Sequence, residues 1–270
     1  MTNTRQDFFD PRKVLSEITS AVKENPNGID YITFVGEGEP TLCASLGYLI
    51  HQVKSRTHLP VAVITNGSLL YDPFVRNELL NADVVLPSLD AGDSETFLRI
   101  NRPHKSINFD SMLNGLKEFS KVFHGQFWIE VMLVKNLNDS EKELKKISEA
   151  LEDIKPDRVY INVPIRPPAE SWVEIPDEDT IVKAHEILHS YVIAKYEEGD
   201  FHIDDPSQLY DAILKICERH PMREEQVRNL AKKFVANADK IIVNLKNDPN
   251  VKVIQYRGKT FFVVIQKNYF

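Results

Sequence analysis

Five times in the first 200 residues, a short apolar run is followed by a segment whose apolar residues recur every three or four positions. The run is typical of a buried strand and the segment of an amphipathic helix. Their alternation through short connections indicates parallel βα units. The predicted strands are 31–35, 61–64, 84–87, 127–134 and 158–163, and the predicted helices are 11–24, 45–55, 72–80, 109–122, 140–154 and 178 to about 196.

The chain after residue 205 has a different pattern. Three predicted helices, the first beginning at Asp205-Pro206, precede two strands at 251–256 and 260–265. Arg257-Gly258-Lys259 between the strands is a hairpin turn signal. Three helices and a β-hairpin form the winged-helix pattern. We therefore expect an α/β domain over residues 1–200 and a small winged-helix domain over residues 205–270.

Charge and composition support this division and narrow the class of protein. The formal charge is −7, which separates into −12 for the first 204 residues and +5 for the rest. Hydrophobic residues make up 42% and charged residues 27%, as in globular chains. No apolar run approaches the roughly 18 residues of a membrane span, and the first residues lack a signal pattern. We expect a cytoplasmic protein without a membrane partner.

Polar and glycine-containing segments follow the predicted strands, where ligands bind in parallel sheets and barrels. The sharpest is Gly36-Glu37-Gly38-Glu39-Pro40, whose glycines let a ligand approach the backbone and whose carbonyls and carboxylate suit an ammonium group. The alternative is a tight acidic loop. The other candidates are Thr65, Asn66, Ser88, Asp90, Arg102, His104, Asn136, Asn162 and Arg166.

Each of these residues also has a structural interpretation. Asn66-Gly67 is a common turn, Ser88 or Asp90 can cap a helix, and a loop arginine or histidine is often only solvated. Their joint placement at consecutive strand ends favours one shared cleft. Ser88 and Asp90 alternate around Leu89, so both can reach a pair of ribose hydroxyls. The guanidinium of Arg102 can donate two parallel hydrogen bonds, which suits a carboxylate or a phosphate.

These segments resemble the radical S-adenosylmethionine (SAM) superfamily, and most closely its subgroup of archaeal tRNA wyosine-type synthases and similar Fe–S oxidoreductases. The resemblance covers essentially the first 200 residues and implies a partial (β/α) barrel that binds SAM. It implies that the Gly36–Pro40 loop, with Gly38 and Glu39, holds the methionyl ammonium. It places Ser88 and Asp90 near the ribose, Arg102 by the carboxylate, and the segment Val134–Asn138 by the adenine.

The family's CxxxCxxC loop, which ligates a 4Fe-4S cluster, is absent, as is the first strand of the barrel. Cys43 and Cys217 cannot replace the three thiolates, so we expect no metal site in this chain. The sequence is interpreted as a fragment or a mis-called start, as a degenerate relative, or as a chain whose partner supplies the loop. In each case we expect the chain as given neither to bind a cluster nor to cleave SAM reductively.

Two functions remain open at this point. One is a radical SAM oxidoreductase-like protein whose parent chemistry abstracts hydrogen from a substrate, with RNA suggested by the resemblance alone. The other is a non-catalytic scaffold that binds nucleic acid or a protein through the winged helix, although that unit can equally be a lid. The candidate nucleic-acid contacts are Lys240, Asn244, Lys246, Arg257 and Lys259.

Overall fold

The computed structural model describes residues 2–25, 28–36, 38–164, 167–168, 170–191, 209–219, 221–235, 237–256 and 258–264. The chain divides into two compact units. The first comprises Met1–Val163 with Val173–Ile193, and the second comprises Pro164–Trp172 with Ala194–Phe270. No helix among the described residues is long and apolar enough to cross a membrane.

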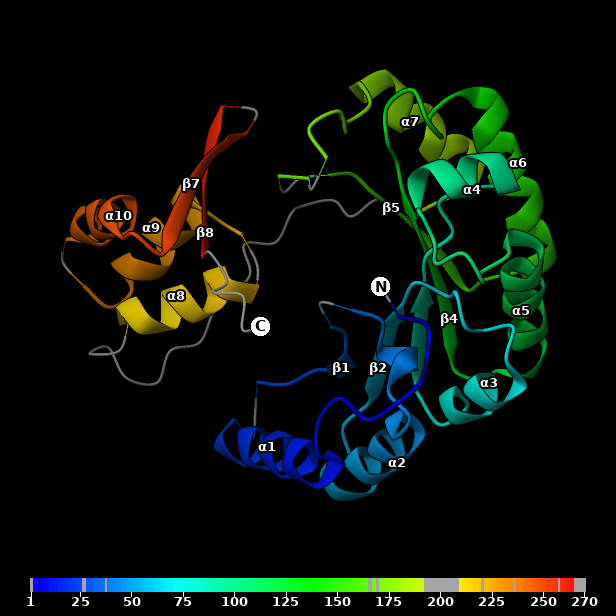
Figure 1. Ribbon diagram of the computed structural model, residues 1–270, viewed down its shortest axis with the longest axis horizontal. Helices are drawn as coiled ribbons and strands as arrows, with labels where there is room; N and C mark the ends of the chain where they lie inside the picture. The colour runs from blue at the N-terminus through cyan, green and yellow to red at the C-terminus, as the bar shows by residue number, and fades with distance from the viewer. Residues whose placement is uncertain are drawn as a thin grey trace. The chain divides into compact units, whose positions relative to one another are not determined.

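The first unit is built on a parallel sheet of five strands in the order β1-β2-β3-β4-β5 (Figure 1). Every strand pairs with the next in the sequence, as repeated right-handed βα units produce. The prediction of an α/β fold with a partial barrel of parallel strands is confirmed. The strands are β1 (Ile32–Phe34), β2 (Val61–Thr65), β3 (Val84–Pro87), β4 (Gln126–Met132) and β5 (Arg158–Asn162).

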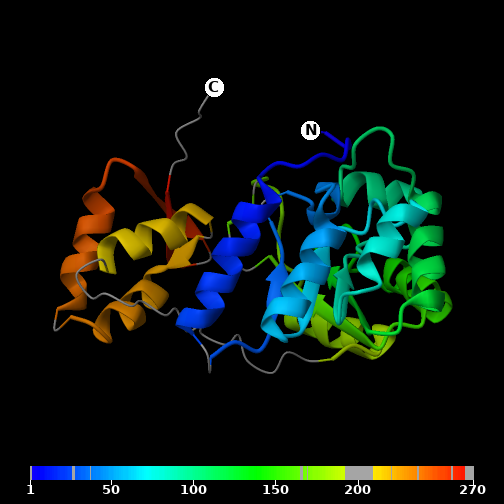
Figure 2. The ribbon, with the colours of Figure 1, turned by 90° about the horizontal axis from the view of Figure 1, so that it is seen from below.

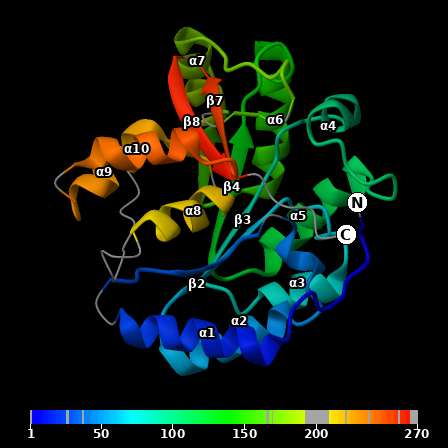
Figure 3. The same ribbon diagram turned by 60° about the vertical axis from the view of Figure 1, so that its left-hand side comes forward.

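Helices cover one face of this sheet, and α1 lies beside α2 in all three ribbon views (Figures 1, 2 and 3). Aspartate side chains cap several of them: Asp10, Asp72 and Asp177 each accept a hydrogen bond from a first-turn backbone amide. The helices are α1 (Pro11–Glu24), η1 (a 3-10 turn, Pro40–Leu42), α2 (Leu46–Thr57), α3 (Pro73–Leu79), α4 (Ser94–Ile100), α5 (Phe109–Val122), α6 (Glu141–Ile154) and α7 (Glu178–Leu188).

The two faces of the sheet differ because side chains alternate along a strand. On the helix-covered face the strands carry fully buried aliphatic residues that share one core with the helices; they include Val61, Val63, Val85, Ile129, Val131, Val159 and Ile161. The alternate positions form what we call the open face, whose side chains are half-buried or exposed; they include Ile64, Leu86, Ser88, Trp128, Glu130, Met132, Arg158, Tyr160 and Asn162.

Two predicted element ends differ from the structure for reasons that local contacts explain. The helix expected to reach residue 196 ends at Leu188, where His189 adopts a left-handed conformation (φ 48°). Tyr191 then pairs with Tyr160 at the edge of the sheet. The strand predicted to reach Val134 ends at Met132, because the Val134 amide donates to the Asn138 side chain instead of a neighbouring strand.

In its described residues, the second unit has its own core of three helices and a three-stranded antiparallel sheet in the order β6-β8-β7. Gly258 (φ 73°) lies in the hairpin turn, where only glycine adopts this conformation at low cost. The predicted helices and hairpin are present, β6 was missed, and the winged-helix assignment stays a prediction. The elements are α8 (Leu209–Arg219), β6 (Met222–Arg223), α9 (Glu224–Lys232), α10 (Ala238–Asn247), β7 (Val251–Tyr256) and β8 (Lys259–Val264).

Candidate functional site

Glu39 joins the ends of the first two strands. Its Oε1 atom accepts hydrogen bonds from the Thr41 amide (3.0 Å), the Thr41 hydroxyl (2.6 Å) and the Thr65 hydroxyl (2.5 Å). Its Oε2 atom accepts from the Asn66 amide at 2.7 Å. The carboxylate therefore holds the glycine loop against the end of β2, and only Oε2 retains substantial capacity to accept from a ligand.

Asp90 joins the ends of β3 and β4 in a buried network. Its carboxylate accepts from the Met132 amide at 2.8 Å and from the Asn101 side-chain amide at 2.7 Å. Burial raises the pKa of Asp90 to about 6, and Glu130 adds to the increase, whereas the two hydrogen bonds oppose it. Asp90 is only 8% exposed, so its main contacts are with the protein.

Asn138 completes this network from the segment after β4. It is fully buried, and its side-chain amide donates to the carbonyls of Asp90 and Met132 at 2.8 Å each. Its Oδ1 atom accepts from the Val134 amide at 2.8 Å. One side chain thereby satisfies three buried backbone groups and fixes the segment that the resemblance places near adenine.

Ser88 and Glu130 lie opposite each other on the open face, in an isolated bridge between the β3 and β4 segments. The described residues offer the Ser88 hydroxyl no hydrogen-bond partner within the protein. Burial raises the pKa of Glu130, and the Asn162 side chain approaches it at 3.4 Å. A hydroxyl, a carboxylate and an amide thus line the open face near the strand ends and remain available to a ligand.

The glycine loop is open to a ligand as well. Gly36 and Gly38 are exposed, and a Cβ atom on Gly38 would meet no heavy atom of the surrounding structure within 4 Å. Packing within the protein therefore does not explain the glycine at position 38, whereas close approach of a ligand would. Asn136 adopts a left-handed conformation (φ 61°), and its backbone amide donates to the Asp139 carboxylate. Asp139 therefore braces this turn, and Ser140 rather than Asp139 caps α6.

The predicted residues of the loop after α4 are less closely tied to this site. His104 Nδ1 lies 2.8 Å from the Ser106 hydroxyl, and the hydrogen bonds of the described residues do not join His104 to the strand-end networks. Arg102 adopts a left-handed conformation (φ 45°) and already has an interaction within the protein. Arg166 lies outside the described residues.

Comparison with known proteins identifies the family. A family model described as the radical SAM superfamily matches residues 2–147, more than half of the chain. The chain belongs to the radical SAM superfamily. It is 32% identical over 270 residues to a UPF0026 protein of Methanocaldococcus jannaschii, which covers 97% of this chain and 83% of that protein.

Other relatives match over part of their length. The chain is 45% identical over 178 residues to a protein named GTPase Obg of Brachyspira hyodysenteriae, covering 66% of this chain and 26% of that protein. It is 26% identical over 184 residues to a protein named probable dual-specificity RNA methyltransferase RlmN of Thermotoga petrophila, covering 65% of this chain and 52% of that protein. The chain thus spans about a quarter and about half of these two relatives.

A solved structure shares the fold of this radical SAM chain. The crystal structure of a radical SAM methyltransferase from Sphaerobacter thermophilus gives a TM-score of 0.52 at 15% identity, covering 67% of this chain and 55% of that one. At this identity the similarity establishes the fold and not the reaction.

The residues of this radical SAM chain suit SAM better than they suit an iron–sulfur cluster. Asn101 Oδ1 is buried beside Asp90 and has no hydrogen-bond partner among the described residues, so it is an acceptor that a further donor such as a ribose hydroxyl would satisfy. The described residues contain no group of three side chains that could hold a metal ion. Burial raises the pKa of the Cys43 thiol, and raises that of Cys217, in the second unit, to about 11, which disfavours the thiolate form.

Sequence reasoning missed Arg5, which anchors the segment before α1 to the strand-end loops. Its guanidinium donates to the carbonyls of Thr41 (2.9 Å) and Cys43 (3.0 Å) and pairs with Glu78. Gln6 also pairs with Cys43 through the backbone. The signal in the sequence was weak, because a single arginine before a helix is usually solvated.

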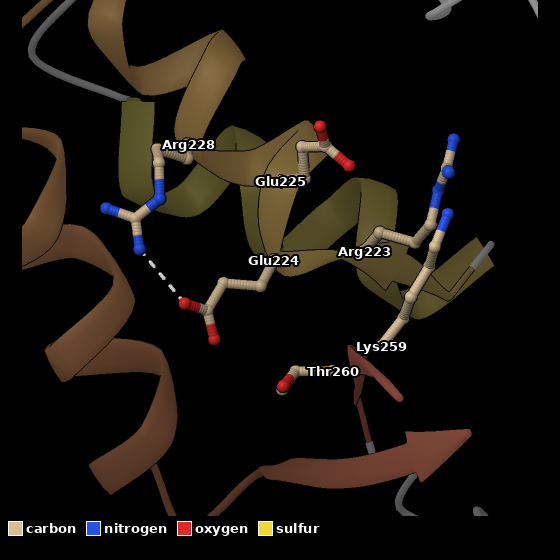
Figure 4. Close-up of a pocket in the computed structure, with 6 residues that line it drawn as sticks. All are labelled: Arg223, Glu224, Glu225, Arg228, Lys259 and Thr260. Carbon is tan, nitrogen blue, oxygen red and sulfur yellow. Dashed lines mark hydrogen bonds and ion pairs between the residues drawn. The ribbon is translucent and has the colours of Figure 1, made fainter. Parts of the chain in front are cut away.

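The second unit uses one of its predicted nucleic-acid contacts internally. Lys246 pairs with Glu224 at 2.8 Å, and Glu224 also pairs with Arg228 at 2.9 Å. A cavity of about 230 Å³ lies beside this ion pair (Figure 4). It is lined by Arg223, Glu224, Glu225, Arg228, Lys259 and Thr260.

The other predicted nucleic-acid contacts differ in position. Two of them, Lys240 and Asn244, are exposed on α10, and Lys259 is exposed on β8. Arg257 lies outside the described residues.

Proposed function

We propose that the first unit is the SAM-binding body of a radical SAM enzyme. The observation that supports this most strongly is the row of polar groups at the ends of consecutive strands. Glu39, Thr65 and Asn66 form one hydrogen-bonded set, and Asp90, Asn101, Met132 and Asn138 form the other. Ser88, Glu130 and Asn162 lie on the open face of the same sheet.

In this proposal the protein binds SAM by contacts along that row. Backbone carbonyls of the exposed glycine loop accept from the methionyl ammonium, and Glu39 holds the loop in place. The Ser88 hydroxyl and Asn101 Oδ1 bind the ribose hydroxyls, and Asp90 positions Asn101. The segment Val134–Asn136, fixed by Asn138, lies against the adenine. Arg102 binds the SAM carboxylate.

SAM supplies the radical chemistry of this family, and the protein's own residues bind and orient the reactants. Glu130 and Asn162 are placed to accept from and donate to a substrate on the open face. Since the described residues do not supply ligands for a 4Fe-4S cluster, we assign no step to a cluster here. We also propose oxidoreductase chemistry and an RNA substrate. The RNA substrate is supported by the Thermotoga petrophila relative, which is named as an RNA methyltransferase.

The test is calorimetric titration of the chain with SAM, together with the variants Ser88→Ala and Ser111→Ala. Ser88 has its hydroxyl free at the open face, whereas Ser111 is exposed on α5 and serves as the matched control. We expect saturable binding that is weakened about tenfold by Ser88→Ala, as for the loss of one or two hydrogen bonds, and unchanged by Ser111→Ala. Equal affinity in both variants would remove Ser88 from the site.

A nucleic-acid role for the second unit is a second candidate, supported by one observation. Arg223 and Lys259 extend side by side in Figure 4, and neither forms an ion pair with another described residue. Two cations that form no ion pair with a described residue suit a phosphate backbone. Salt-dependent binding of a duplex that weakens in Arg223→Met/Lys259→Met, and not in Lys246→Met, would support this role.

A further inference from the structure

The open face carries an arginine–aromatic cluster that the SAM site does not use. We define it as Trp128, Arg158, Tyr160 and Tyr191, all in the first unit. The Arg158 guanidinium carbon lies 5.0 Å from the centre of the Trp128 ring and 5.4 Å from that of Tyr191. Arg158 Nη1 also donates to the Tyr160 hydroxyl at 3.1 Å. Two rings and a hydroxyl therefore hold the guanidinium in place.

Strand pairing places these side chains together on one face. Trp128 on β4 pairs with Arg158 on β5, and Tyr160 pairs with Tyr191. The alternate residues of β5, Val159 and Ile161, point into the core with the helices. The cluster is thus part of the sheet, and its geometry follows from register rather than from a loop.

The charge of Arg158 is not neutralised within the described part of the protein. Arg5 pairs with Glu78 and Arg228 pairs with Glu224 and Asp239, but Arg158 forms no ion pair with a described carboxylate. Arg158 is exposed, and one of its five N–H groups is used by Tyr160. The remaining donors suit an oxyanion, and a guanidinium already held by rings loses little entropy when an anion binds.

The exposed rings supply a second kind of contact. Tyr191 is 54% exposed, so part of its ring is free to stack on a planar group. Such stacking contributes about 1–3 kcal/mol per nucleic-acid base. A ligand that combines an oxyanion with a flat heterocycle would use both features, and Glu130, two residues from Trp128 on the same face, would accept from its amino groups.

We propose that the arginine–aromatic cluster is a nucleotide site, in which Arg158 binds the phosphate and Tyr191 stacks on the base. Arg158 precedes Asn162 at the strand end by four residues, or roughly 13 Å along β5. A nucleotide bound here would extend along the open face toward the proposed SAM site. The proposal rests on the proposed function only in identifying the nucleotide as the substrate; the nucleotide site itself does not depend on SAM binding.

The test uses guanosine 5′-monophosphate as the probe, because an adenine nucleotide could enter the proposed SAM site. Binding is measured by calorimetry to the intact chain and to Arg158→Met, Tyr191→Leu and the control Arg12→Met, an exposed arginine on α1. We expect affinity to fall about tenfold or more in Arg158→Met, by the loss of charge-assisted hydrogen bonds, and about fivefold or more in Tyr191→Leu. Arg12→Met should bind normally, and guanosine and ribose 5-phosphate should each bind more weakly than the nucleotide.

Several results would overturn the proposal: no binding of guanosine 5′-monophosphate to the folded chain, equal affinity in Arg158→Met, or ribose 5-phosphate binding as tightly as the nucleotide. SAM titration of the same variants separates this proposal from the previous one. Loss of nucleotide binding in Arg158→Met with unchanged SAM binding supports both. An Arg158-dependent nucleotide site in a chain that does not bind SAM would uphold this site and remove the SAM assignment.

Discussion

The two faces of the five-stranded sheet are built from neighbouring residues of the same strands, yet they differ in chemistry. On β4, Ile129 and Val131 are fully buried against the helices, whereas Trp128, Glu130 and Met132 on the open face are half-buried. Parallel sheets normally have both faces covered. The comparison indicates that the helix-covered face stabilises the fold, and the open face is the one on which we propose the ligand sites.

The largest effect on stability is expected on the helix-covered face. Ile129→Ala removes a fully buried side chain and leaves a cavity, so the free energy of unfolding should fall by about 2–5 kcal/mol. Urea denaturation followed by circular dichroism measures the change. A loss below about 1 kcal/mol would show that this face is not the main core of the unit.

The buried network at the ends of β3 and β4 should be nearly as sensitive. Asn138→Ala leaves the Val134 amide and two carbonyls without their partner, at a cost of roughly 2–4 kcal/mol. Asn81→Ala, at an exposed position before β3, is the matched control and should cost less than about 0.5 kcal/mol. Similar stability in the two variants would contradict the proposed role of Asn138.

Asp90 should make stability depend on pH. Because burial raises its folded pKa to about 6, whereas the unfolded carboxyl titrates near 4, folded Asp90 binds its proton more tightly. Its stabilising effect is therefore present below pH about 4 and is lost as the pH rises to about 6. The stability of the wild type relative to Asp90→Asn should fall by on the order of 2–3 kcal/mol from pH 4 to 7, measured by urea denaturation at each pH. A constant difference would contradict the raised pKa.

The smallest effect on stability is expected on the open face. Glu130→Gln removes a carboxylate whose pKa is raised by burial, so the variant should be as stable as the wild type or slightly more stable at pH 7, within about 1 kcal/mol. The adjacent Ile129→Ala is its internal comparison. Marked destabilisation by Glu130→Gln in the same denaturation experiment would mean that the open face is part of the folding core.

Much of the fold could be predicted because it depends on local signals. The apolar strands, the helical spacing of α5 and α6, and caps such as Asp10 and Asp177 are all readable within a few residues. The end of α7 was missed because His189 adopts a left-handed conformation that the sequence does not mark with glycine. The strand β6 was missed because two residues are too short to show alternation.

The positions of the candidate site residues at the strand ends could be predicted from the sequence, but the hydrogen bonds that they form could not. The strand-end location of Glu39, Ser88 and Asp90 follows from βα topology, whereas the bonds of Asp90 to Asn101 and Met132 join residues 11 and 42 positions apart. The arginine–aromatic cluster needs the register of β4 on β5, which places Trp128 beside Arg158. No pattern within either strand specifies that register uniquely.

Hydrogen–deuterium exchange with and without SAM tests directly whether the strand ends and the open face form the ligand site. We expect slower exchange on SAM addition in the segments around Gly36–Thr41, Ser88–Asn101 and Val134–Asn138, and unchanged exchange in the second unit. Unchanged exchange in all three segments, or protection confined to the second unit, would contradict it.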